Sequence, residues 1–219
     1  MHLEILVEDQ SGKIALETII PKIVGPQGTP HTWKITAYKG IGGLPKDLGK
    51  QKDPRKRILL DRLPALLRGY GKAFRGYPAL VIVVCDLDRR DESAFRAELE
   101  AVWQDCDPHP PTLFCLAIEE GEAWLLGDRE AVLAAYPEAR TGVLDAYQQD
   151  SVCGTWELLA DAIHPGGAAA LKRLGFPPTG EAKCAWARTI PPHMDMDRNR
   201  SPSFCRFRDG IRHSLPGDP

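Results

Sequence analysis

Residues 79–85, Ala-Leu-Val-Ile-Val-Val-Cys, form the strongest strand candidate in the chain, and Asp86-Leu87-Asp88 follows at once. An apolar run without alternation is typical of a strand in the middle of a parallel sheet, where both faces are covered. This run ends in carboxylates, and open parallel sheets bind their ligands at the carboxyl ends of the strands. We therefore expect a central strand whose end contributes to a functional site.

Two other segments repeat this order of an apolar strand followed by acidic residues. Leu3–Val7 ends in Glu8 and Asp9, and a helical pattern begins at Ser11. A later apolar run, Thr112–Ile118, is followed by a helix that begins near Ala123, and the residues between are Glu119-Glu120-Gly121-Glu122. Three strands are thus predicted to end in acid at one edge of a sheet.

The first half of the chain alternates strand and helix patterns. Thr32–Tyr38 has the apolar-polar alternation of a half-buried strand, and residues 54–74 have the pattern of a basic amphipathic helix. Pro64 is expected to kink or divide that helix, because a helix interior does not tolerate proline well. The alternation predicts an α/β fold with a mostly parallel central sheet flanked by helices, over residues 1–128.

The second half of the chain shows no further convincing strand. We expect residues 129–219 to form a helical extension packed over one side of the core, not an independent domain. Its helical patterns, separated by Gly and Pro, lie at Arg129–Ala135, Trp156–Ile163, Ala168–Leu174 and Ser203–His213.

Composition narrows the class of protein. The 219 residues have a formal charge of -2, so binding to nucleic acid would require a local basic patch or metal ions. The six cysteines form no Cys-x-x-Cys pair, which argues against a zinc site. The first residues lack the pattern of a signal peptide, and no apolar run reaches the ~20 residues that cross a membrane. We expect a cytoplasmic, reduced protein with no membrane association.

The acidic strand ends predict a metal site. Asp86 and Asp88 are two residues apart, so in an extended chain they point the same way. Like charges that are brought together favour a cation between them, and Mg²⁺ prefers carboxylates, waters and substrate phosphate. Each acid taken singly is more typical of a helix N-cap. Three acidic ends in one sheet favour a site for Mg²⁺ or Mn²⁺.

The arrangement resembles a known fold. The order of segments is similar to that of the TOPRIM fold of topoisomerases, DnaG-type primases and OLD-family nucleases. It consists of Ile5-Leu6-Val7-Glu8, then a helix, and then Val83-Val84-Cys85-Asp86-Leu87-Asp88. That resemblance implies catalytic Mg²⁺ held by the Glu and by the Asp-x-Asp.

More closely, Glu120-Gly121-Glu122-Ala123-Trp124-Leu125-Leu126 resembles an uncharacterised bacterial TOPRIM-like family called RloG-like. Leu59–Leu67 and Ser201-Pro202-Ser203-Phe204 are also similar to that family. The resemblance covers about the first 130 residues well and the tail only thinly.

Two positions depart from the TOPRIM pattern. Asp9 stands where a Gly usually follows the first acid, and it adds charge to the site. Arg89-Arg90-Asp91 follows the Asp-x-Asp, so the residue for a second metal is open. Glu120 and Glu122 are the candidates, with Glu119 as the alternative.

We assign roles on this basis as a hypothesis. Asp86, Asp88 and one of Glu120 or Glu122 would hold the metal, and Glu8 would ligate it or act as general acid and base. Lys183 would bind phosphate or stabilise the leaving group. Two groups of arginines would either line a groove that binds the nucleic-acid backbone or form an exposed face. The groups are Arg55 and Arg57 on the basic helix, and Arg198, Arg200, Arg206 and Arg208 in the tail.

The function expected first is a metal-dependent nuclease that acts on DNA or RNA. Only the family resemblance implies a role in phage defence. The alternative is a non-catalytic TOPRIM-like subunit that binds a partner ATPase, since the chain has no phosphate-binding loop of its own. A receiver or flavodoxin-like regulator is disfavoured, because neither a suitable strand lysine nor a Gly-rich cradle is present. The sequence leaves the oligomeric state open, with a homodimer among the options.

Overall fold

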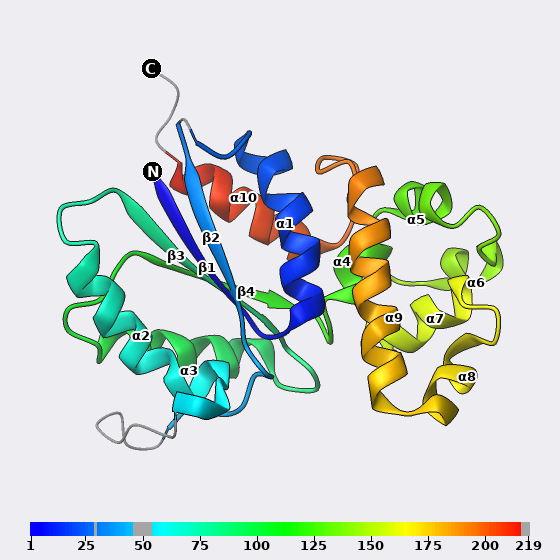
Figure 1. The fold of residues 1–219 in the computed structure, drawn as a ribbon, viewed down its shortest axis with the longest axis horizontal. Helices are drawn as coiled ribbons and strands as arrows, with labels where there is room; N and C mark the ends of the chain where they lie inside the picture. The colour runs from blue at the N-terminus through cyan, green and yellow to red at the C-terminus, as the bar shows by residue number, and fades with distance from the viewer. Residues whose placement is uncertain (29, 46–53, 216–219) are drawn as a thin grey trace.

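The computed structural model describes residues 1–28, 30–45 and 54–215. A four-stranded parallel sheet in the order β2-β1-β3-β4 forms its centre (Figure 1). The strands are β1 His2–Val7, β2 Thr32–Ala37, β3 Ala79–Asp86 and β4 Thr112–Ala117. The α/β class, the parallel sheet and all four strands therefore agree with the prediction from sequence.

The burial of each strand follows from its position in the sheet. β3 pairs with β1 on one side and with β4 on the other, and seven of its eight residues are buried. Residues 79–85 thus form the central strand that their unbroken apolar character predicts. β2 is an edge strand, and its residues are mostly half-buried.

Helices cover both faces of the sheet. α1 (Gln10–Val24) and α10 (Pro202–Ser214) pack on the face that includes Leu3, Ile5 and Ile82. α2 (Leu59–Ala73) and α3 (Glu92–Gln104) contribute to the core on the opposite face. The chain therefore changes faces between α1 and α2, which creates a switch point between β1 and β3.

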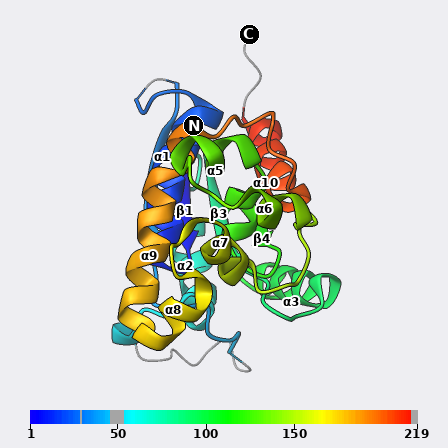
Figure 2. The same ribbon diagram turned by 90° about the vertical axis from the view of Figure 1, so that its right-hand side faces the viewer.

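The rest of the second half lies beyond the carboxyl ends of the strands and against α1 (Figure 1). Figure 2, seen from that side, shows these helices in front of the sheet. They are α4 Glu122–Leu126, α5 Arg129–Ala135, α6 Thr141–Ala146, α7 Thr155–Ile163, α8 Gly167–Leu174 and α9 Phe176–Thr189. The sequence predicts that the extension covers one side of the sheet. Among its helices in residues 129–215, α10 packs on a strand, β4, and the others lie elsewhere because α4 directs the chain away from the end of β4.

Prolines lie inside two helices, and Pro64, which is expected from sequence to kink or divide its helix, does not divide it. Pro177-Pro178 occupies the first turn of α9, where proline is well tolerated because the first helical N–H groups have no partner within the helix. Pro64 lies inside α2, which continues without interruption from Leu59 to Ala73. Pro64 is only the sixth residue of that helix, so one backbone hydrogen bond is lost close to the end.

The basic helix also begins later than expected. Arg55 belongs to a separate short 3₁₀ helix, Pro54–Lys56, and Arg57 has a left-handed backbone with φ 53°. A second 3₁₀ helix, Pro191–His193, follows α9. None of the helices in the described ranges is both long and apolar enough to cross a bilayer.

Candidate functional site

Glu8 and Asp86 meet at the switch point of the sheet. Glu8 directly follows β1 and Asp86 ends β3, its neighbour in the sheet. An oxygen of the Glu8 carboxylate accepts the backbone N–H of Asp86 at 3.1 Å. The two acids that the sequence places at separate strand ends are therefore in contact, at the position where open α/β sheets bind ligands.

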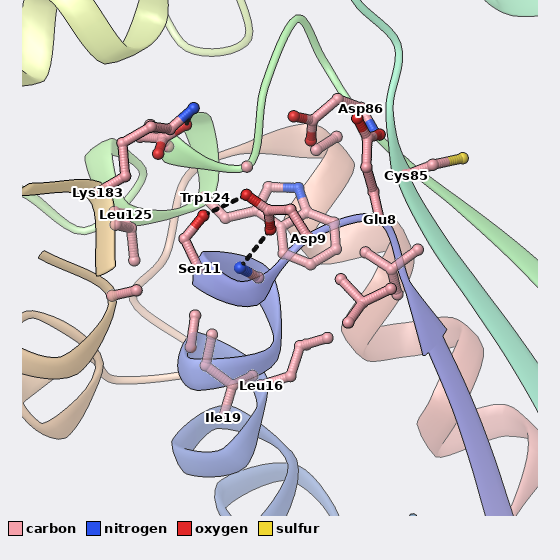
Figure 3. A pocket seen from close by; sticks show the side chains of 18 residues that line it. Glu8, Asp9, Ser11, Leu16, Ile19, Cys85, Asp86, Trp124, Leu125 and Lys183 are labelled. Atoms are coloured by element: carbon pink, nitrogen blue, oxygen red, sulfur yellow. Dashed lines mark hydrogen bonds and ion pairs between the residues drawn. The ribbon is translucent and has the colours of Figure 1, made fainter. Parts of the chain in front are cut away.

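A small pocket opens beside these two acids. Figure 3 shows Glu8 and Asp86 on one wall, Lys183 from α9 on the other, and Asp9 and Ser11 between them. Cys85 points away from the pocket (Figure 3). The cavity volume is about 50 Å³, which holds a few water molecules or one small ion, since a single water needs roughly 10–15 Å³.

Asp9 and Ser11 fix the floor of this pocket. Asp9 is the N-cap of α1 and accepts the Gly12 N–H at 2.7 Å and the Ser11 hydroxyl at 2.5 Å. A Cβ on Gly12 would lie 2.6 Å from Cγ2 of Val7, so only glycine lets α1 begin this close to β1. No role is predicted for Ser11 from sequence, although Asp-x-Ser-Gly before a helical pattern is a capping signal.

Burial makes the ionised form of Glu8 unfavourable. It raises the pKa of Glu8 to about 7; the N–H of Asp86 opposes this in part, and the charges of Asp88 and Asp9 add to it. Burial likewise raises the pKa of Asp86 well above its ordinary value, and the charges of Glu8 and Glu122 act in the same direction. A nearby cation would relieve this repulsion.

The ammonium group of Lys183 supplies a positive charge beside these acidic residues. Its Nζ lies 3.2 Å from an oxygen of Glu122 and 3.5 Å from one of Glu120. Burial alone would lower the pKa of Lys183, but the carboxylates of Glu122, Glu120 and Asp86 hold it well above its ordinary value. Burial also raises the pKa of Glu120 to about 7, against the opposing charge of Lys183.

Asp88 differs from Asp86 in position. β3 ends at Asp86, and Asp88 has φ 52°, so the extended geometry that would point both side chains the same way does not continue. The Asp88 side chain is 52% exposed and lies 3.2 Å from Arg90. It lines a wider open groove that it shares with Glu119, Glu120 and Trp156.

The four predicted metal ligands are therefore not gathered around one point. Glu122 lines the pocket with Glu8 and Asp86, Glu120 contacts Lys183 beside it, and Asp88 faces outward. Within residues 1–28, 30–45 and 54–215, no three His, Cys, Asp or Glu side chains are placed together to hold a metal ion. One or two carboxylates suffice for Mg²⁺, which keeps several waters and binds substrate phosphate. The carboxylates of Glu8 and Asp86 fit that requirement.

Glu119 has a structural role. Its carboxylate accepts the backbone N–H groups of Cys153 at 3.1 Å, Gly154 at 3.0 Å and Thr155 at 2.9 Å, and also the Thr155 hydroxyl. Partial burial raises the pKa of Glu119, but these hydrogen bonds outweigh it and leave the pKa below its ordinary value. Glu119 thus caps the N-terminus of α7 from a distant part of the chain.

The predicted nucleic-acid-binding arginines are dispersed. Arg198 makes two hydrogen bonds of 2.8 and 2.9 Å to the buried carboxylate of Asp128. Arg206 pairs with Glu92, and Arg208 donates to the carbonyl of Met196. Arg200 is exposed in the same tail, and Arg55 and Arg57 are exposed ahead of α2. These arginines do not form a single groove.

Comparison with models of protein families, with curated proteins and with solved structures gave no match. The relation to known folds therefore rests on the sheet. A four-stranded parallel sheet in the order β2-β1-β3-β4 is compatible with TOPRIM-like and Rossmann-like folds.

Proposed function

We propose that this chain is a metal-dependent nuclease that hydrolyses phosphodiester bonds of DNA or RNA, with the RloG-like and OLD-family TOPRIM proteins as its distant counterparts. The contact between Glu8 and Asp86 at the switch point, with Glu122 and Lys183 in the same pocket, is the observation that supports it. Acids with raised pKa values beside a specific charged partner, in a cleft, are typical of catalytic sites.

Each residue has a role in this proposal. Glu8 and Asp86 would hold Mg²⁺ or Mn²⁺, which polarises a scissile phosphate when bound. Alternatively, Glu8 that is not bound to metal has a pKa of about 7, which suits it to move a proton to or from water near neutral pH. Lys183 neutralises Glu120 and Glu122 and offers its ammonium to a substrate phosphate. Glu122 holds Lys183 in place for this.

A cleavage panel tests the proposal. Plasmid, linear DNA, single-stranded DNA and RNA are incubated with the protein in Mn²⁺, Mg²⁺ or EDTA, beside Asp86→Asn. Glu98→Gln, an exposed acid on α3, is the matched control. We expect metal-dependent cleavage by the wild type and the control but not by Asp86→Asn. Cleavage that survives in EDTA or in Asp86→Asn contradicts the proposal.

Thermal melting provides a second measurement that does not depend on activity. We expect Mn²⁺ to raise the melting temperature of the wild type and of Glu98→Gln, and to raise that of Asp86→Asn much less, because bound metal stabilises the folded state by mass action. An equal rise in all three proteins would place the metal elsewhere.

One observation favours the alternative, a non-catalytic subunit that binds a partner such as an ATPase. Leu174 and Phe176 are 63% and 85% exposed on either side of Gly175, at the turn between α8 and α9. Exposed apolar side chains of this size are typical of protein contacts. This alternative predicts that the Mn²⁺ response persists while no substrate in the panel is cleaved.

A further inference from the structure

A second pocket opens at the carboxyl end of β2, near the acidic pocket. It has a cavity volume of about 510 Å³ and is open to solvent. We call it the basic pocket; its lining residues are Gln10, Lys13, Ile35, Thr36, Ala37, Tyr38, Lys39 and Arg57. The three charged side chains among them are all cations, whereas the pocket beside Glu8 is lined by four carboxylates and one lysine.

The backbone joins the basic pocket to the acidic site. The N–H of Gly40 donates to the carbonyl of Glu8 at 3.0 Å, and the N–H of Lys39 donates to the carbonyl of Arg57 at 2.8 Å. Lys13 lies on the first turns of α1, whose N-cap is Asp9. Lys13 and Lys39 therefore belong to segments attached to Asp9 and Glu8, and Arg57 is connected to them through Lys39.

The three cations keep donors for a ligand. Arg57 uses one N–H for the carbonyl of Ala37 at 2.8 Å, and a guanidinium has five donors. Lys13 lies 3.6 Å from Glu17, an exposed pair that is weak in water. Lys39 is exposed, and no ion pair holds its side chain within the described part of the chain.

We propose that the basic pocket binds phosphate groups of a polynucleotide strand and holds that strand beside Glu8. This inference rests on the proposed nuclease function and names the means by which its substrate is bound. A pocket with Glu8, Asp86 and Glu122 repels a polyanion, and the chain as a whole has a formal charge of -2. A nearby group of cations supplies the local attraction, through release of counterions from the strand.

Binding is measured without cleavage to test this inference separately from the nuclease. Fluorescence anisotropy of a labelled single-stranded oligonucleotide is recorded in EDTA over a series of salt concentrations. The variants are Lys39→Glu and the double variant Lys39→Glu/Arg57→Glu. The matched control is Lys72→Glu/Arg75→Glu, which reverses two exposed charges near the end of α2. Melting temperatures show whether each variant is folded.

We expect the double variant to bind roughly 10- to 100-fold more weakly at low salt, with Lys39→Glu intermediate and the control unchanged. The slope of log affinity against log salt is expected to fall by about 0.7 for each phosphate group that the variant no longer neutralises. Equal binding by wild type and double variant, or equal weakening by the control, overturns the inference. Inorganic phosphate that competes at a concentration similar to that of oligonucleotide phosphates also overturns it, since the pocket then binds free phosphate.

The two proposals fail in different ways. Binding that depends on Lys39 and Arg57, without cleavage in Mn²⁺, supports the basic pocket and contradicts the nuclease. Cleavage by the wild type that proceeds equally well in the double variant supports the nuclease and contradicts the basic pocket.

Discussion

At the scale of single residues, Lys183 is the cation that lets several carboxylates share one small space. Glu122 is buried and has Lys183 Nζ at 3.2 Å. Removal of one partner of a buried ion pair leaves the other charge uncompensated. We predict that Lys183→Met lowers the free energy of unfolding by about 3 kcal/mol in urea denaturation, the lower end for a broken buried ion pair.

Lys172→Met is the matched control for this prediction. Lys172 lies 3.1 Å from Glu157, but its side chain is 57% exposed, so its loss is expected to cost less than about 1 kcal/mol. Equal losses in the two variants would mean that Lys183 does not compensate the acidic site.

The raised pKa of Glu8 predicts how stability depends on pH. The pKa is about 7 in the folded protein against an ordinary value of 4.5, so the folded state holds this proton more tightly. The associated stability is fully present below about pH 4.5 and is lost as the pH rises through 7. The loss is at most about 3 kcal/mol.

Urea denaturation in EDTA between pH 5 and pH 8 measures this dependence. We expect the free energy of unfolding to fall with pH in the wild type and in Glu98→Gln. Glu8→Gln is expected to flatten the curve, because it removes one titrating group and one charge that raises the pKa of Asp86. An unchanged slope in Glu8→Gln would show that Glu8 titrates normally.

At the scale of elements, Glu119 connects the loop after β4 to α7. It accepts three backbone N–H groups at the start of that helix, the function of an N-cap performed by a distant residue. We predict that Glu119→Ala costs about 2 kcal/mol, the upper range for loss of a cap, in urea denaturation.

Hydrogen exchange locates this effect in the chain. The amides of residues 153–155 are expected to lose protection in Glu119→Ala, while Glu138→Ala, an exposed acid after α5, leaves them unchanged. Retained protection at those amides would rule out the capping role.

The elements also show how far sequence patterns predict this molecule. The strands can be predicted because β3 is apolar throughout and three strands are each followed by acidic residues. Parallel pairing of β1 with β3 then brings Glu8 and Asp86 together. α9 is not predictable in this way, since Pro177-Pro178 resembles a break. The sequence marks Lys183 as a candidate phosphate-binding residue because lysines are scarce in the tail. It does not predict the helix, α9, that positions this side chain.

The geometry within the site depends on turns that patterns do not specify. The left-handed backbone at Asp88 turns its side chain away from the orientation of Asp86, and no spacing rule predicts that departure. Likewise Glu119, one of three neighbouring acids, is distinguished only by the segment 153–155 that folds against it.

At the scale of the whole molecule, the C-terminal half completes the core. Trp124 stacks on Phe207 with ring centroids 4.7 Å apart, and its indole N–H donates to Ser203 at 3.0 Å. Asp128 is paired with Arg198. We predict that a fragment of residues 1–128 does not unfold cooperatively, because Trp124 and the part of the sheet face that α10 covers at β4 become exposed.

Circular dichroism during urea denaturation tests this prediction, with residues 1–219 as the control. The full chain is expected to give a single sigmoidal transition and the fragment a broad, gradual one. A cooperative transition in the fragment would show that the α/β core is autonomous.

The most direct test of the central claim is the rate at which one labelled oligonucleotide is cleaved in Mn²⁺ by wild type, Asp86→Asn and Glu98→Gln. Asp86 is proposed to hold the metal that polarises the reacting phosphate, so Asp86→Asn is expected to lower the rate at least ~100-fold. Glu98→Gln is expected to match the wild type. Equal rates in all three proteins, or no cleavage and no thermal response to Mn²⁺ in the wild type, would contradict the account.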